Sequence, residues 1–86
     1  MIRTYSNPLI VLSATKKVDR GTTTCEVIAE TTDQNSQSEM VVTFVGKRAE
    51  SACKELIKGA RFTYRGIVQF EDRRPKLIGI TFSRID

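Results

Sequence analysis

The chain has 86 residues, enough for one small domain spanning residues 1–86. Fourteen Lys and Arg residues against ten Asp and Glu residues give a formal net charge of +4, which favours polyanionic partners. Histidine is absent and there are two cysteines, so the usual general base and a four-ligand zinc set are both missing. We therefore expect no enzyme, no metal and no cofactor. The N-terminal residues hold no long apolar run, which indicates an intracellular protein without a membrane span.

Two strands joined by a turn are predicted in the first third of the chain. Residues 8–17 form an apolar run in which Pro8 is tolerated only at the beginning of a strand. Arg20-Gly21 is a turn signal. Residues 22–32 then alternate with a period of two. The side expected to face the core holds Cys25, Val27 and Ala29.

A third strand and a helix follow a polar loop at residues 33–38. In the strand, residues 39–46, the expected core set is Met40, Val42 and Phe44, and the outward set is Val41, Thr43 and Val45. The period then changes to that of a helix. Its apolar stripe consists of Ala49, Ala52, Cys53, Leu56 and Ile57. Gly59 is the residue expected to end this helix.

The last two strands are predicted at residues 61–71 and 76–85, on either side of the charged turn Asp72-Arg73-Arg74-Pro75. Gly66 in the middle of the fourth strand indicates a bulge or a tight bend. In the fifth strand, Ile78, Ile80 and Phe82 are expected to face one way. The resulting order, β-β-β-α-β-β, is that of the OB-fold, an all-β, five-stranded Greek-key barrel with one helix.

The two cysteines lie at positions that favour burial. Cys25 falls in a predicted strand and Cys53 on the apolar stripe of the predicted helix. Buried cysteines outside a disulfide behave as small apolar residues. We expect two buried free thiols, with a single disulfide as the alternative.

The stretch from Val41 to Val68 resembles the central part of bacterial single-stranded DNA-binding proteins (SSBs). The matching pieces are Phe44-Val45-Gly46-Lys47, Ala49-Glu50, Leu56-Ile57-Lys58-Gly59 and Arg65-Gly66. The resemblance implies the OB-fold and sequence-tolerant binding of single-stranded DNA in replication, recombination or repair. It also implies a cytoplasmic, bacterial or phage-encoded protein that forms a dimer or higher homo-oligomer, with a replication or repair protein as a further partner.

The chain departs from the SSB pattern at two places. Tryptophan is absent, and Val45 and Glu39 stand where typical family members stack bases. The acidic, Phe-ended tail of cellular SSBs has no counterpart in Arg84-Ile85-Asp86. These differences favour a compact accessory version, such as one from a phage or mobile element, or a relative of the dimeric primosomal protein B.

Candidate nucleic-acid contacts are the basic and aromatic residues that an OB-fold would place around its binding face. A basic groove holds phosphates there, and aromatic rings stack on bases. The candidates are Lys16, Lys17, Arg20, Arg61, Arg65, Phe70, Arg73, Arg74 and Lys76. Lys54 and Lys58, on the predicted helix, are expected to be plain surface.

The outward face of the second and third strands suggests a different hypothesis. Glu26 and Glu30 would repel phosphates there. Ile28, Val41 and Val45 are apolar on the same face, which is typical of a protein interface. The alternative function is therefore a protein-interaction OB module, a primosomal or replisome accessory. An RNA-binding OB domain is a third hypothesis, although the chain has no cluster of aromatic residues of the RNA-binding kind.

Overall fold

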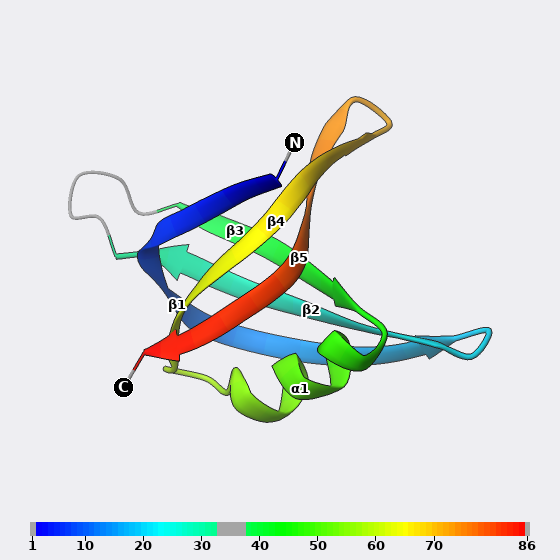
Figure 1. Cartoon of the computed structure of the whole chain (residues 1–86), viewed down its shortest axis with the longest axis horizontal. Coiled ribbons are helices and arrows are strands. Elements are labelled where there is room, and N and C mark those ends of the chain that lie inside the picture. Colours follow the sequence, from blue (N-terminus) through cyan, green and yellow to red (C-terminus); the bar gives the residue numbers. More distant parts are fainter. Residues whose placement is uncertain (1, 33–37, 86) are drawn as a thin grey trace.

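The computed structural model describes residues 2–32 and 38–85, in which five strands form a barrel with one helix across its end (Figure 1). The elements are β1 (Ile2–Asp19), β2 (Thr22–Thr31), β3 (Glu39–Val45), α1 (Lys47–Glu55), β4 (Arg61–Glu71) and β5 (Arg74–Ile85). This is the predicted order, and the OB-fold prediction is confirmed. Most of the polar loop predicted at residues 33–38 lies outside the described residues. No helix in the described ranges has the length and apolarity needed to cross a membrane.

The strands close into a ring in the order β1-β2-β3-β5-β4. Neighbouring strands are antiparallel except β3 and β5, whose short parallel contact joins Val42, Thr43 and Phe44 to Leu77, Ile78 and Gly79. β1 begins six residues earlier than predicted because its first half pairs with β4 and its second half with β2. Pro8, which has no N–H to donate, lies where the register between β1 and β4 shifts.

The core follows the alternation seen in the sequence. Cys25, Val27, Ala29, Val42 and Phe44 are fully buried, and Met40 packs against them. The helix stripe is confirmed at the residues that close one end of the barrel, which are Ala49, Ala52 and Leu56. The prediction for the end of the stripe is wrong. The helix ends at Glu55, so Ile57 lies beyond it and is 54% exposed. Gly59, with φ 89°, belongs to the turn that follows.

A bulge between β4 and β5 sets which side chains of β5 face inward. The register shifts at Arg65 and Gly66, and Ile80 is the extra residue on β5. Gly79 faces the core on one side of this bulge, and Phe82 packs on Phe44 on the other, with ring centroids 5.4 Å apart. The register shifts at Gly66, where the sequence predicted a bulge, but the extra residue lies on β5 and not on β4. The prediction that Ile78, Ile80 and Phe82 face one way is wrong, because the bulge reverses the alternation.

The two cysteines form a disulfide, so the expectation of free thiols is wrong and the alternative holds. Cys25 lies in β2 and is fully buried, and Cys53 lies on α1. The helix packs across the barrel end with its stripe toward β2, and the two Cα atoms lie 6.0 Å apart, within the usual range for a disulfide. The bond therefore fastens the helix to the barrel.

A Cβ atom at Gly79 would overlap the ring of Phe44, which is fully buried and cannot move aside. We expect Gly79→Ala to lower the free energy of unfolding by roughly 1–3 kcal/mol through overpacking. Urea unfolding measures this loss. Ser83→Ala, at an exposed position of the same strand, should stay within about 0.5 kcal/mol of wild type. Equal stability of Gly79→Ala and wild type would contradict this packing.

Candidate nucleic-acid interface

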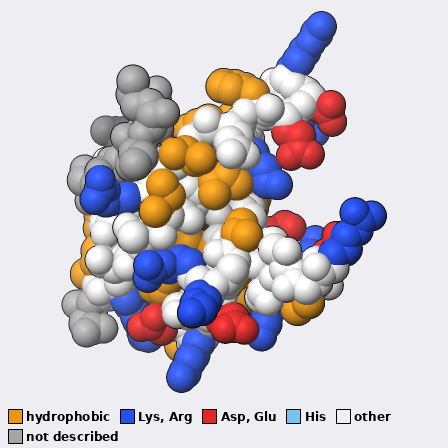
Figure 2. Space-filling view, turned by 45° about the vertical axis from the view of Figure 1, so that its right-hand side comes forward, with side chains coloured by type: hydrophobic (Ala, Val, Ile, Leu, Met, Phe, Trp, Pro, Cys, Tyr) orange, Lys and Arg blue, Asp and Glu red, His pale blue; other side chains and the backbone are white. Residues whose placement is uncertain are grey.

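Two hairpins extend beyond the barrel and form projections at one side of the molecule. We call residues 16–25 the β1–β2 arm and residues 68–77 the β4–β5 arm (Figure 1). The space-filling view shows an open space between the two projections, with basic side chains at both ends (Figure 2). The predicted contact residues near the two turns are therefore brought to one side of the fold.

The β4–β5 arm ends in a tight two-residue turn. Asp72 and Arg73 both have positive φ, 52° and 66°, and Glu71 lies opposite Arg74. Positive φ at both central residues is typical of a type I′ hairpin turn. This turn holds Arg73 and Arg74 at the tip of the arm, where both are exposed.

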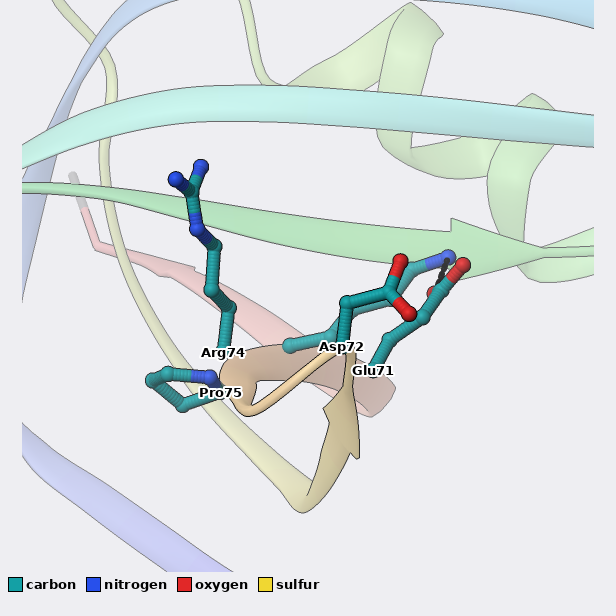
Figure 3. Close-up of a pocket in the computed structure, with 5 residues that line it drawn as sticks. Glu71, Asp72, Arg74 and Pro75 are labelled. Carbon is teal, nitrogen blue, oxygen red and sulfur yellow. Dashed lines mark ion pairs between the residues drawn. The ribbon is translucent and has the colours of Figure 1, made fainter.

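Charge on the β4–β5 arm is partly neutralised within the arm. Lys76 Nζ lies 3.6 Å from a carboxylate oxygen of Glu71, in an exposed ion pair. Arg74 extends away from this pair (Figure 3). A shallow hollow of about 520 Å³ lies beside the turn and is lined by Glu71, Asp72, Arg74, Pro75 and Lys76. Within the described ranges, neither Arg73 nor Arg74 forms an ion pair. Their charges therefore stay available to an external anion.

Phe70 is the most exposed large apolar residue in the described part of the chain, at 75%. It lies on the β4–β5 arm directly opposite Pro75. Pro75 in turn lines a groove of about 330 Å³ with Glu39, Met40, Val41 and Leu77. This groove could not be predicted from the sequence, because it forms between the first residues of β3 and β5, which are distant in the chain. The exposed ring of Phe70 therefore lies next to the mostly apolar surface of this groove.

The β1–β2 arm carries fewer available charges than predicted. Lys17 Nζ lies 3.1 Å from Glu26 Oε1, so one predicted phosphate contact is paired with a carboxylate on the neighbouring strand. Lys16 lies opposite the core residue Cys25 and therefore points to the other face of the hairpin from Lys17. Arg20 is exposed in the turn. Within the described ranges Arg20 forms no ion pair, so its charge at the tip of this arm stays available to an anion.

Arg61 and Arg65 lie on β4, exposed and on the opposite side of the strand from the buried Phe62 and Tyr64, as the parity predicted. The neighbours of β4 in the barrel are β1 and β5, so these arginines do not share a face with β2 and β3. The predicted contact residues therefore do not form a single cluster around the outer face of β2 and β3.

The outer face of β2 and β3 combines apolar and acidic residues. Val41 and Val45 are 44% and 45% exposed, and Ile28 is half-buried opposite Val41. Glu30 and Glu39 lie directly opposite each other at one end of this face. The two carboxylates repel each other and would also repel phosphates, so this face is poorly suited to a nucleic-acid backbone. No group of three or more His, Cys, Asp or Glu residues that could hold a metal is found in the described ranges.

A five-stranded barrel with a helix between β3 and β4 and two basic arms defines a small OB-fold domain. Among solved structures, the chain is similar to the SSB domain of a protein from Synechococcus sp., with a TM-score of 0.75 and 10% identity over 95% of this chain and 90% of that one. It is also similar to the N-terminal domain of the PriB protein from Thermoanaerobacter tencongensis, a dimeric structure, with a TM-score of 0.75 and 13% identity over 99% and 96% of the two chains. The fold that the SSB resemblance implied is thereby confirmed over nearly the whole chain. No protein-family model and no curated protein matches the sequence.

Proposed function

We propose that this protein binds single-stranded DNA with little sequence preference and acts in replication, recombination or repair. The observation that carries the proposal is the 75% exposed ring of Phe70 on an arm whose tip bears Arg73 and Arg74. Aromatic stacking contributes about 1–3 kcal/mol per base, and basic side chains neutralise phosphates. The arm thus combines the two interactions that non-specific single-strand binding requires.

The same features favour a single strand over a duplex. A ring can stack only on a base whose face is free, and in a duplex the base faces lie inside the helical stack. The groove lined by Glu39, Met40, Val41, Pro75 and Leu77 is mostly apolar, lies beside Phe70 and can cover a second base without reading its edges. The arrangement therefore supports tolerance of sequence.

Two SSB-like domains of known structure share this fold, which adds support from architecture alone. The fold carries many functions, so the residues of the arms carry the argument. We expect Lys17 and Lys76 to contribute less to binding because each has a carboxylate partner. Lys16 points to the opposite side of its hairpin from Lys17. We therefore expect modest affinity that falls steeply with salt.

Fluorescence anisotropy of a labelled dT20 oligonucleotide tests this proposal, with matched duplex DNA and oligo-U as competitors. We expect binding at low salt that weakens linearly in log affinity against log salt concentration. Duplex DNA should displace the probe poorly, and oligo-U measures the preference for DNA over RNA. Absence of binding even at low salt would contradict the proposal.

A second candidate function is protein docking through the outer face of β2 and β3. The exposed Val41 and Val45, with Ile28 beside Val41, support a homodimer or a replication protein as partner. The dimeric structure of the PriB domain is consistent with a homodimer. Light scattering of the wild-type protein across salt concentrations tests self-association, since an apolar interface depends little on salt.

A further inference from the structure

The outer face of the β4–β5 hairpin is one continuous surface from the arm to the far end of the barrel. Residues that lie opposite each other on antiparallel strands point to the same side. From the tip downward, the outward pairs are Glu71 with Arg74, Gln69 with Lys76, Ile67 with Ile78, Arg65 with Thr81, Thr63 with Ser83 and Arg61 with Ile85. Ten residues of extended strand separate Glu71 from Arg61, a length of roughly 33 Å.

Charge separates sharply between this surface and the outer face of β1, β2 and β3. On the hairpin and its tip, five basic side chains face two acidic ones, a net charge of +3. These are Arg61, Arg65, Arg73, Arg74 and Lys76, against Glu71 and Asp72. On the outward side of residues 7–32 and 38–45, two basic side chains face four acidic ones, a net charge of −2. These are Lys17 and Arg20, against Asp19, Glu26, Glu30 and Glu39.

The half of the hairpin surface farthest from the tip is built from small polar side chains around Arg65. A hollow of about 210 Å³ is lined there by Thr63, Tyr64, Arg65, Thr81, Phe82 and Ser83. Hydroxyl groups donate hydrogen bonds to phosphate oxygens, and arginine binds phosphate with two parallel donors. Between Arg65 and Arg61, the outward residues of β4 and β5 include no carboxylate.

From these observations we propose that a single strand that stacks on Phe70, on the core-facing side of the β4–β5 arm, passes around the arm at Arg73 and Arg74 and continues along the outer face of the β4–β5 hairpin, past Arg65 to Arg61. The strand does not cross the outer face of β2 and β3, which is the usual binding face of the OB-fold. This inference rests on the proposed function and specifies the path of the nucleic acid. Apart from Glu39 and Val41, which line the groove beside Phe70, the outer face of β2 and β3 stays free for a protein.

The test compares dT20 affinity and salt dependence for wild type, two double variants and one single variant. Arg61→Glu with Arg65→Glu reverses the charge along the proposed path, and Arg48→Glu with Lys54→Glu makes the same change in net charge at exposed positions of α1. Glu30→Gln removes a carboxylate from the face that the strand avoids, outside the groove beside Phe70. Circular dichroism checks folding, and Arg61→Gln with Arg65→Gln serves if the reversed variant is unfolded.

We expect the variant of Arg61 and Arg65 to bind at least tenfold more weakly than the helix variant, with a salt slope lower by about 2. Glu30→Gln should bind within twofold of wild type. If wild type binds but the variants of Arg61 and Arg65 match the helix variant, the path is refuted while the proposed function stands. A marked gain in affinity for Glu30→Gln would also refute the path. Failure of wild type to bind would refute the proposed function itself.

Discussion

Arg73→Glu with Arg74→Glu should weaken dT20 binding by on the order of tenfold or more at low salt, and it should lower the salt slope by about 2. Both side chains are exposed at the tip of the β4–β5 arm, and neither forms an ion pair within the described ranges. The reversal therefore replaces two phosphate contacts with two repulsive charges. Anisotropy titrations between about 50 and 200 mM salt measure both quantities.

A single change at the same turn gives the matched control. Arg73 has φ 66°, a conformation that costs an ordinary residue about 1 kcal/mol or more and that glycine adopts freely. We expect Arg73→Gly to raise the free energy of unfolding by about 1 kcal/mol while it lowers the salt slope by about 1. Stability and affinity then change in opposite directions, which separates the loss of charge from damage to the fold. Unaltered affinity in both variants would remove the turn from the interface.

Loss of the disulfide should have the largest effect on stability. We expect Cys25→Ala with Cys53→Ala to lower the free energy of unfolding by roughly 3–4 kcal/mol, since the two residues are 28 positions apart and the bond restricts the unfolded chain. The helix has few other anchors. Its buried residues are the small Ala49 and Ala52, followed by Leu56, and the residue before its first turn, Gly46, has no side chain to cap it. The helix end of the barrel should therefore loosen first.

Urea unfolding with and without a dithiol reductant measures this contribution. Reductant should destabilise the wild-type protein and leave the alanine variant unchanged, which controls for other effects of the reagent. Thiol titration of the urea-unfolded, unreduced protein should find no free thiol. Two titratable thiols under these conditions would contradict the disulfide. Disulfides rarely persist in a reducing cytoplasm, so this bond argues against the cytoplasmic location expected from the sequence. That location stays a prediction.

Most of the fold was predictable because its signals are local. Alternation identified the core side chains of β2 and β3, such as Val27 and Phe44, and Gly66 marked the bulge. The errors arose where distant segments meet. The extra residue Ile80 reverses the faces of β5, which no pattern within that strand reveals. The disulfide depends on how α1 packs against β2. A sequence pattern indicates that a cysteine is buried, but it does not show which residue of another element lies next to it.

The candidate site was predictable as a set of residues but not as a surface. Arg73, Arg74 and the exposed Phe70 lie on one arm as expected from the turn signal. Ion pairs with neighbouring strands make two of the predicted basic residues less available to phosphate, since Glu26 pairs with Lys17 and Glu71 with Lys76. The closed order of the barrel then separates β4 from β2 and β3. Barrel closure is a long-range property, so the division into a basic hairpin and an acidic face emerges only from the register.

A titration of isotope-labelled protein with unlabelled dT20, followed by the backbone amide signals in NMR at low salt, tests whether single-stranded DNA binds along the β4–β5 hairpin. We expect salt-reversible shifts concentrated on this hairpin, from Arg61 through Phe70 to Arg74, with little change at Glu26, Ile28 and Glu30. Shifts centred on β2 and β3 would place the strand on the other face and contradict the path. A spectrum that dT20 leaves unchanged would contradict single-strand binding altogether.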